Sequence, residues 1–323
     1  MREELEHSYD VVVVGGGAAG LNGALMLARA RRSVVVIDAG SPRNAPAHAV
    51  HGLLGREGIS PAELLARGRD EVRQYGGHVV PGTVAAVSRD VDRFTVELGD
   101  GRTLAARRIL VATGLVDELP DVDGLRERWG RDVVHCPYCH GWEIRGQAIG
   151  VLATGPLAVH QALMFRQWSD DVVLFTHTAA PPSVEQAEQL AARGIDVVTG
   201  TVSGLESTGD RLTGVRMDDG RVVARQALAV GARMTARADF LAGLGLRTQE
   251  HVSGAGEHLV ADGTGRTEVP GVWVAGNATD LSAQVGAAAA AGALAGAHVN
   301  ADLIEEETRQ AVAAFRSTTR EAS

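Results

Sequence analysis

Short apolar runs rich in β-branched residues alternate with glycine-rich turns and amphipathic stretches along the chain. Residues 11–14 form the first run, which enters the glycine loop 15–20 and then a helical pattern over residues 21–29. A second apolar run covers residues 33–37 and ends before Asp38. This order of strand, glycine loop, helix and strand predicts a βαβ unit with parallel strands.

The same order returns in the middle of the chain. Residues 149–152 and 171–175 predict strands on either side of a helix over residues 159–168. In each half a hairpin and a further strand follow, at residues 94–98, 102–106 and 109–111 in the first half and at residues 212–217, 221–224 and 227–230 in the second. This weak duplication predicts an α/β protein with two Rossmann-like dinucleotide-binding domains, the second inserted into the first.

The insertion requires the chain to return to the first domain. Residues 269–276 read as a strand that ends in glycine, and an Ala/Gly-rich helix follows to about residue 299. A second amphipathic helix with a frayed end is expected over residues 300–323. We therefore expect the first domain to consist of two parts with the insert between them, with boundaries at residues 1–115, 116–246 and 247–323.

The loop 15–20 matches the G-x-G-x-x-G pattern in the context that a dinucleotide site requires. Gly15 permits the tight turn, Gly17 lets the backbone approach a pyrophosphate at the helix N-terminus, and Gly20 lets the helix pack close to the strand. Ala18 lies in the same loop. Asp38 ends the second strand, where a carboxylate can accept hydrogen bonds from a ribose. We expect these residues to bind a dinucleotide cofactor.

Both cysteines of the chain lie in the stretch HCPYCHGWE, which covers residues 135–143. The spacing of Cys136 and Cys139 indicates a redox pair or a metal site, because a disulfide between them would close too short a loop to restrain the unfolded chain much. His140 follows directly, and an imidazole has a pKa suited to proton transfer from thiols near neutral pH. We expect Cys136, Cys139 and His140 to be catalytic, with His135 a less favoured base.

Composition narrows the function without identifying it. The 323 residues are 45% hydrophobic and 22% charged, which is typical of a globular protein. The formal charge of −9 argues against nucleic acid and anionic membranes as partners. The chain contains no lysine, so that every basic site residue must be Arg or His. No secretory signal is visible at the start, and residues 285–299 are too short and too weakly hydrophobic to span a bilayer, so we expect a cytoplasmic protein.

The chain resembles the low-molecular-weight thioredoxin reductases in four features that follow one another in the same order. These are the glycine loop, the strand ending in Ala-Thr-Gly, the CxxC pair and the returning strand. In this family of FAD enzymes a CxxC in the second domain exchanges electrons with the flavin. The resemblance implies FAD as the cofactor and a homodimer as the assembly. It also implies flavin contacts from two segments, with the residues Ala112, Thr113, Gly114, Gly276, Asn277 and Gln284.

The chain departs from the reductase pattern at the nicotinamide site and at the redox pair. Ala153 replaces the first glycine of the second loop, and residues 176–178, Thr-His-Thr, lack the arginines that would hold a 2′-phosphate. His140 stands where the reductases place an Asp, and Asn277 replaces another Asp. Tight NADPH binding is therefore not expected.

This combination resembles the dithiol oxidases of holomycin and gliotoxin biosynthesis. The resemblance implies flavin-dependent oxidation of a small dithiol, such as a dithiol natural product, to its intramolecular disulfide. Molecular oxygen would accept the electrons and become hydrogen peroxide. The substrate would be a small molecule, and no metal is expected.

Four other interpretations remain open at this stage. A reductase of thioredoxin or of a small disulfide, supplied by NAD(P)H or another donor, is the main rival. The motif CPYCH also fits a c-type haem attachment site, which would require export and a haem pocket. A zinc site formed by Cys136, Cys139 and two histidines is a further alternative, although the chain has no second CxxC. A flavin-bearing redox sensor without turnover is the fourth. The isolated residues His48 and His51 receive no role.

Overall fold

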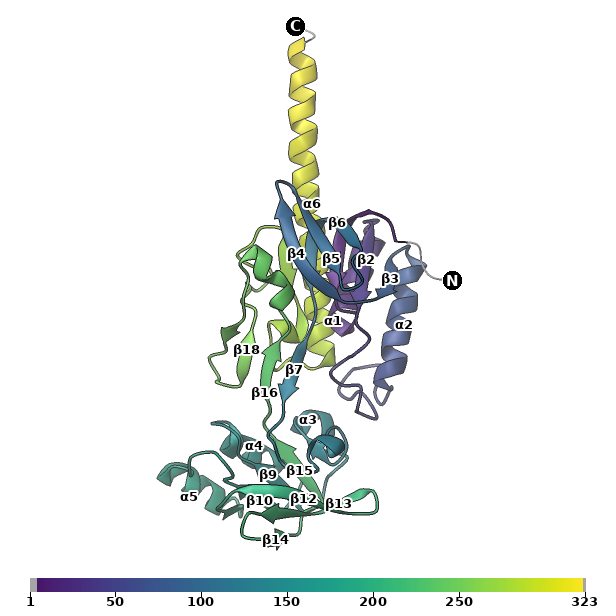
Figure 1. Ribbon diagram of the computed structural model, residues 1–323. Helices are drawn as coiled ribbons and strands as arrows, with labels where there is room; N and C mark the ends of the chain where they lie inside the picture. The colour runs from purple at the N-terminus through teal and green to yellow at the C-terminus, as the bar shows by residue number, and fades with distance from the viewer. Residues whose placement is uncertain (1–4, 322–323) are drawn as a thin grey trace.

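Two sheets with parallel central strands, each covered on both faces, form the two lobes of the computed structural model, which describes residues 5–321 (Figure 1). The first sheet has the strand order β3-β2-β1-β6-β5-β4, with β19 beside β6. Its central strands run parallel, and β4 and β5 form an antiparallel extension. The strands are β1 (Ser8–Val14), β2 (Val34–Asp38), β3 (His78–Pro81), β4 (Val84–Asp90), β5 (Arg93–Leu98), β6 (Thr103–Val111) and β19 (Val272–Val274).

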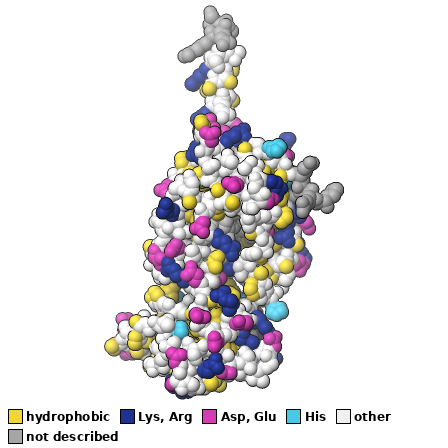
Figure 2. Space-filling view, in the orientation of Figure 1, with side chains coloured by type: hydrophobic (Ala, Val, Ile, Leu, Met, Phe, Trp, Pro, Cys, Tyr) yellow, Lys and Arg dark blue, Asp and Glu magenta, His cyan; other side chains and the backbone are white. Residues whose placement is uncertain are grey.

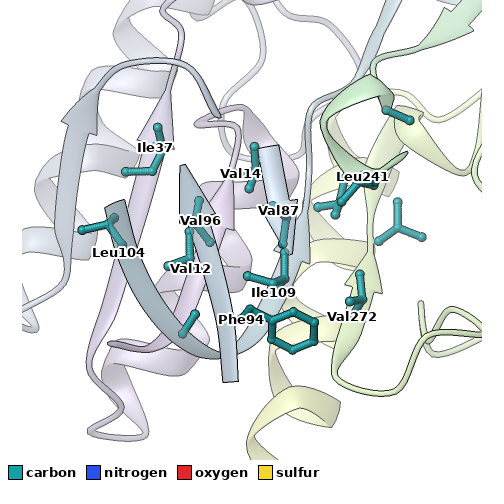
Figure 3. Close-up of a cluster of buried hydrophobic side chains, with 14 of the residues drawn as sticks. Val12, Val14, Ile37, Val87, Phe94, Val96, Leu104, Ile109, Leu241 and Val272 are labelled. Carbon is teal, nitrogen blue, oxygen red and sulfur yellow. The ribbon is translucent and has the colours of Figure 1, made fainter. Parts of the chain in front are cut away.

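The continuous apolar runs of the sequence arise because this sheet is buried on both faces. Successive side chains of a strand point to opposite faces, so both sets need apolar residues when both faces are covered. In β1, Val12 and Val14 join one core cluster and Val11 and Val13 join the other. Figure 3 shows the first cluster, which includes Val12 of β1 and Phe94 of the hairpin strand β5.

Helices α1 (Ala18–Arg29), α2 (Pro61–Gln74) and α6 (Val285–Glu321) complete the first lobe. The start of α6 packs so closely on α1 that a Cβ at Gly292 would overlap the carbonyl oxygen of Ala19. Close backbone contact of this kind requires small residues, which explains the Ala/Gly-rich composition of residues 285–299.

The expected break between two C-terminal helices is wrong, because α6 is a single helix of 37 residues. Residues 300–321 contain neither Gly nor Pro, so nothing in them stops a helix. The expected frayed end at residues 322–323 lies outside the described residues. The last turns of α6 project beyond the body of the lobe (Figure 1).

Two neighbouring arginines tie α6 to the sheet. The expected strands 102–106 and 109–111 are one continuous strand, β6, and Arg107 and Arg108 lie in its middle. The Arg108 guanidinium lies 2.6 Å from Asp302 and 2.6 Å from Glu306. Arg107 contacts Glu306 and Glu307. The polar pair that appeared to separate two strands in the sequence is therefore neutralised by carboxylates from the distant helix.

The second lobe repeats the architecture with a shorter sheet. Its order is β11-β10-β9-β15-β8, all parallel. The strands are β8 (Val133–Val134), β9 (Ile149–Leu152), β10 (Val172–Phe175), β11 (Asp196–Val198) and β15 (Ala227–Val230), with helices α3 (Pro137–His140), α4 (Ala158–Phe165) and α5 (Val184–Ala192). An antiparallel sheet of β12 (Val202–Thr208), β13 (Arg211–Met217) and β14 (Val222–Val223) accompanies it. The predicted α/β fold with two Rossmann-like domains is thus confirmed.

The chain crosses between the lobes twice, through two strands that pair with each other. Strand β7 (Leu115–Glu118) leaves the first lobe, and β16 (Arg233–Ala236) returns antiparallel to it. The short strands β17 (Gln249–Glu250) and β18 (Gly256–His258) extend this pair. Leu241 and Leu246 already belong to the core of the first lobe. We therefore propose that the insert ends near β16 rather than at residue 246.

Surface charges are mixed rather than separated. On the face shown in Figure 2, basic and acidic side chains are interspersed over both lobes. Within residues 5–321, no helix is both long enough and apolar enough to cross a membrane.

Candidate functional site: a cavity between the lobes

A cavity of about 330 Å³ lies where the first lobe faces α3 of the second, and it collects most of the residues singled out from the sequence. The glycine loop, the end of β6, the start of α6 and the cysteine turn all contribute to its walls. Among the expected site residues, those that line it are Gly15, Gly17, Ala18, Asp38, Ala112, Thr113, Gly114, Cys136, Cys139, His140, Asn277 and Gln284.

The glycine loop has the shape that a dinucleotide needs. Gly15 adopts φ +106°, a conformation that favours glycine, and Gly17 precedes α1 with open space where a side chain would lie. The loop amides and the N-terminus of α1 can therefore face a pyrophosphate. Gly20 is outside the cavity wall, and its missing side chain lets α1 pack against the Gly15 carbonyl. The residues present thus fit the adenosine and pyrophosphate part of FAD, and Asp38 lies where a residue that binds the ribose is expected.

The opposite end of the cavity is built by β6 and the segment before α6. Thr113 Oγ1 donates a hydrogen bond to the Arg237 carbonyl at 2.8 Å. Asn277 Nδ2 donates to the carbonyls of Ala283 at 2.9 Å and Asp280 at 3.0 Å. A carboxylate at position 277 could not donate these bonds, so the amide has a structural role in shaping the loop. Gly276 does not line the cavity.

The two cysteines form a reduced pair at the start of α3. Their Sγ atoms are 2.7 Å apart, and Cys139 donates to Cys136. This hydrogen bond, together with backbone amides of the turn, lowers the pKa of the Cys136 thiol to about 7, while donating the bond raises the pKa of Cys139. Cys136 is therefore the more acidic thiol of the pair in this arrangement.

His140 enters the same cavity from the last position of α3. Burial is the main reason why its pKa is lowered, so the imidazole is neutral at pH 7 and able to accept a proton. Its Nδ1 is buried and has no hydrogen-bond partner within the described chain. His135, by contrast, is held by the Val230 carbonyl, 3.0 Å from its Nδ1. Of these two histidines, His140 is thus the one whose Nδ1 is buried without a partner among the described residues.

The turn that carries these residues is held by close packing. A Cβ at Gly141 would lie 2.7 Å from the indole of Trp168 and 2.5 Å from the Pro137 carbonyl. The Tyr138 ring contacts the same indole edge-on, with the ring centroids 5.8 Å apart. The glycine after His140 is therefore required for the turn to seat on the lobe.

Sequence reasoning missed the residues that the loop between β2 and α2 brings to the cavity. Arg43 forms a two-pronged ion pair with Asp117 at 2.6 and 2.7 Å, and its charge also favours the Cys136 thiolate. His51 lines the cavity as well, and its Nε2 lies 3.4 Å from Glu143. No pattern in the sequence marks these residues, because the partners that bring them to the cavity, Asp117 and Glu143, are 74 or more positions away.

A second cavity of about 380 Å³ lies beside the loop after β9, where a second dinucleotide site would be expected. Its lining, drawn from the described residues, includes Ala153 and Thr176 but no arginine. The Thr176 hydroxyl accepts a hydrogen bond from the Gly200 amide, and His177 Nδ1 accepts one from the Val202 amide. Both side chains are thus committed to internal bonds rather than to a phosphate.

Across residues 5–321, no group of three or more His, Cys, Asp and Glu side chains comes together in a way that could hold an ion.

The fold and the site define a flavin-dependent disulfide oxidoreductase. The family model described as "Pyridine nucleotide-disulphide oxidoreductase" matches residues 9–297, and the chain belongs to this family. More particularly, it is a thioredoxin reductase-like FAD oxidoreductase related to the holomycin and gliotoxin enzymes, which confirms the predicted family and cofactor.

Relatives of similar length support this assignment. Thioredoxin reductase tcpT of Claviceps purpurea (strain 20.1) is 32% identical over 311 residues, covering 92% of this chain and 95% of the relative. Thioredoxin reductase sirT of Leptosphaeria maculans is 31% identical, covering 90% and 93%. Among solved structures, HlmI has a TM-score of 0.92 at 45% identity, with coverage of 99% and 100%. An oxidoreductase from Agrobacterium tumefaciens has a TM-score of 0.86 at 36% identity, with coverage of 92% and 99%.

The open space at Gly17 yields a test of the cofactor site. We expect Gly17→Val to fold but to lose FAD, with flavin absorbance per protein falling about tenfold or more, because the new side chain occupies the approach to the pyrophosphate. The matched control is Gly155→Val in the second loop, where a side chain also meets open space. Equal flavin loss in both variants, or none in Gly17→Val, would contradict the assignment.

Proposed function

We propose that this protein oxidises a small-molecule dithiol, such as a dithiol natural product, to its intramolecular disulfide. The observation that carries the proposal is the meeting of Cys136, Cys139 and the neutral His140 in one cavity with the dinucleotide loop. We further propose that molecular oxygen is the electron acceptor. The cytoplasm is the proposed location, because a dithiol substrate stays reduced there until the enzyme acts on it.

The cysteine pair begins the reaction as a disulfide. A substrate thiolate attacks the Cys136 sulfur, the bond to Cys139 breaks, and Cys139 leaves as a thiolate. The second substrate thiolate then attacks the substrate sulfur that is bound to Cys136. The substrate leaves with a new S–S bond, and the enzyme retains two thiols, so two electrons and two protons have moved from substrate to protein.

His140 takes a proton from a substrate thiol in each of these steps and passes it to the cysteine thiolate that leaves, which frees it for the next step. Its lowered pKa keeps the imidazole unprotonated beforehand. The glycine loop together with Thr113 and Asn277 would hold FAD, which would supply the acceptor for the electron pair of the cysteine dithiol. Oxygen would then take up that pair and become hydrogen peroxide. The pKa of the Cys136 thiol is lowered to about 7, so this thiol ionises more easily than that of Cys139 and is suited to act as the nucleophile that restores the disulfide.

The second nucleotide loop supports a substrate rather than NADPH as the source of electrons. A 2′-phosphate needs a fixed cation, and the lining of that cavity offers no arginine. The thioredoxin reductase interpretation remains the alternative, because the curated relatives tcpT and sirT carry that name.

We expect anaerobic mixing with a small dithiol to bleach the flavin rapidly, and admission of oxygen to restore the colour with release of hydrogen peroxide. NADPH under the same conditions should bleach it slowly, because its phosphate lacks a partner. Stopped-flow absorbance of the purified holoenzyme measures both rates. Fast bleaching by NADPH without substrate would instead support the reductase alternative.

Substitutions at the redox pair should separate chemistry from cofactor binding. We expect Cys136→Ser and Cys139→Ser to abolish dithiol oxidation while keeping FAD, because neither serine can form a disulfide. His140→Ala should slow turnover about a hundredfold, the size usual for loss of a general base. Oxygen consumption with dithiol measures the rates. Normal turnover in the Cys139 variant would be incompatible with the relay.

We also propose that the protein is a homodimer, as the family resemblance implies. The projecting end of α6 supports this, because Val312 is 41% and Phe315 is 74% exposed there. A helix end of this length is only marginally stable alone in water, and a second copy would cover the same apolar residues symmetrically.

Light scattering should therefore give about twice the 33.7 kDa chain mass. Phe315→Glu should shift the mass toward the monomer, because a charge replaces an apolar contact, whereas the exposed Arg309→Ala should not. A monomeric wild type would end the proposal.

A further inference from the structure

One segment of the first lobe, the loop between β2 and α2, contacts the second lobe at three places around the cysteine turn. Arg43 is paired with Asp117 of the crossing strand β7. Pro46 lies against Gly130, where an added Cβ would come within 2.6 Å of the proline ring. The third contact joins His51 to Glu143, only three residues after His140.

The third contact is a row of three side chains, in which the imidazole of His51 lies between the carboxylates of Glu57 and Glu143. His51 Nδ1 lies 2.6 Å from Glu57 Oε1, and the other Glu57 oxygen accepts the Gly52 amide at 2.9 Å. Glu57 and His51 belong to the same loop, so the contact between them fixes the His51 ring within the first lobe. The remaining ring nitrogen, Nε2, faces Glu143 at 3.4 Å across the lobe boundary.

The position of these three side chains matters more than the stability that their contacts contribute. The Glu57 and Glu143 side chains are 63% and 43% exposed, and pairs of this kind contribute little to overall stability. However, Glu143 ends the same short turn that carries Cys136, Cys139 and His140. Electron transfer between the cysteine pair and FAD depends on the distance and orientation of that turn, so even a small displacement changes the rate.

We propose that His51, held by Glu57, is a positioning residue that binds Glu143 and thereby keeps the cysteine turn seated over the flavin cleft. The proposal rests on electron exchange between the cysteine pair and FAD, and it does not depend on the identity of the dithiol or on oxygen as acceptor. It predicts that the loop between β2 and α2 acts on the rate of the internal redox step and not on cofactor affinity.

The test uses the holoenzyme and dithiothreitol under anaerobic conditions, with flavin reduction followed over a range of dithiothreitol concentrations. We expect His51→Ala and Glu143→Ala each to lower the limiting rate about threefold, the size of a partly exposed ion pair. The dithiothreitol concentration at half-maximal rate and the FAD content should stay unchanged. The double variant should be no slower than either single variant, because both substitutions remove the same contact.

Two further variants distinguish positioning from general damage. His51→Gln retains an amide N–H that can reach Glu143, so it should recover most of the rate. His160→Ala, at an exposed position on α4 of the second lobe, should match the wild type. Wild-type rates in both single variants, multiplied effects in the double variant, or equal slowing by His160→Ala would each overturn the proposal. Because wild-type flavin reduction is measured in the same experiment, a failure of cysteine-to-flavin transfer itself would be visible separately.

Discussion

The antiparallel pairing of β7 with β16 is the constraint on which the site depends. These two strands are the crossings between lobes, and their pairing determines which edge of the second sheet faces the glycine loop of the first. The cysteine turn follows β8 at that edge, so it enters the cavity that the dinucleotide loop opens. The loop between β2 and α2 adds contacts beside the crossing, notably the Arg43–Asp117 pair. A different pairing would leave the sulfur atoms remote from the cofactor site with both lobes otherwise intact.

The boundary between the lobes also tunes the chemistry of the turn. Burial keeps His140 neutral, and hydrogen bonds from Cys139 and from backbone amides stabilise a thiolate on Cys136. Neither effect requires an unusual residue nearby. They arise because a polar turn is enclosed by a second surface, which removes water from the imidazole while the amides of the turn still point at one sulfur.

The two βαβ units of the chain share a fold but differ in their nucleotide loops. The first keeps an open glycine loop and a carboxylate at the end of its second strand. In the second, Thr176 and His177 satisfy backbone amides of their own lobe, and no arginine is among the described residues that line the cavity. Under the proposed function the second lobe therefore serves to carry the cysteine pair, and its nucleotide site is no longer needed.

The sequence by itself determined the fold class and the chemical groups that form the candidate site. Apolar runs buried on both faces, the G-x-G-x-x-G loop between strand and helix, and the CxxC pair are local patterns, and local patterns follow from backbone geometry and side-chain chemistry alone. It was less informative where distant segments meet. The polar residues Arg107 and Arg108 appeared to interrupt a strand, but carboxylates of α6, about 200 positions away, make the strand continuous. Likewise, His51 carried no signal until the tertiary structure brought it to Glu143. Such contacts depend on how two lobes pack, and only the folded chain decides which side chains then share a boundary.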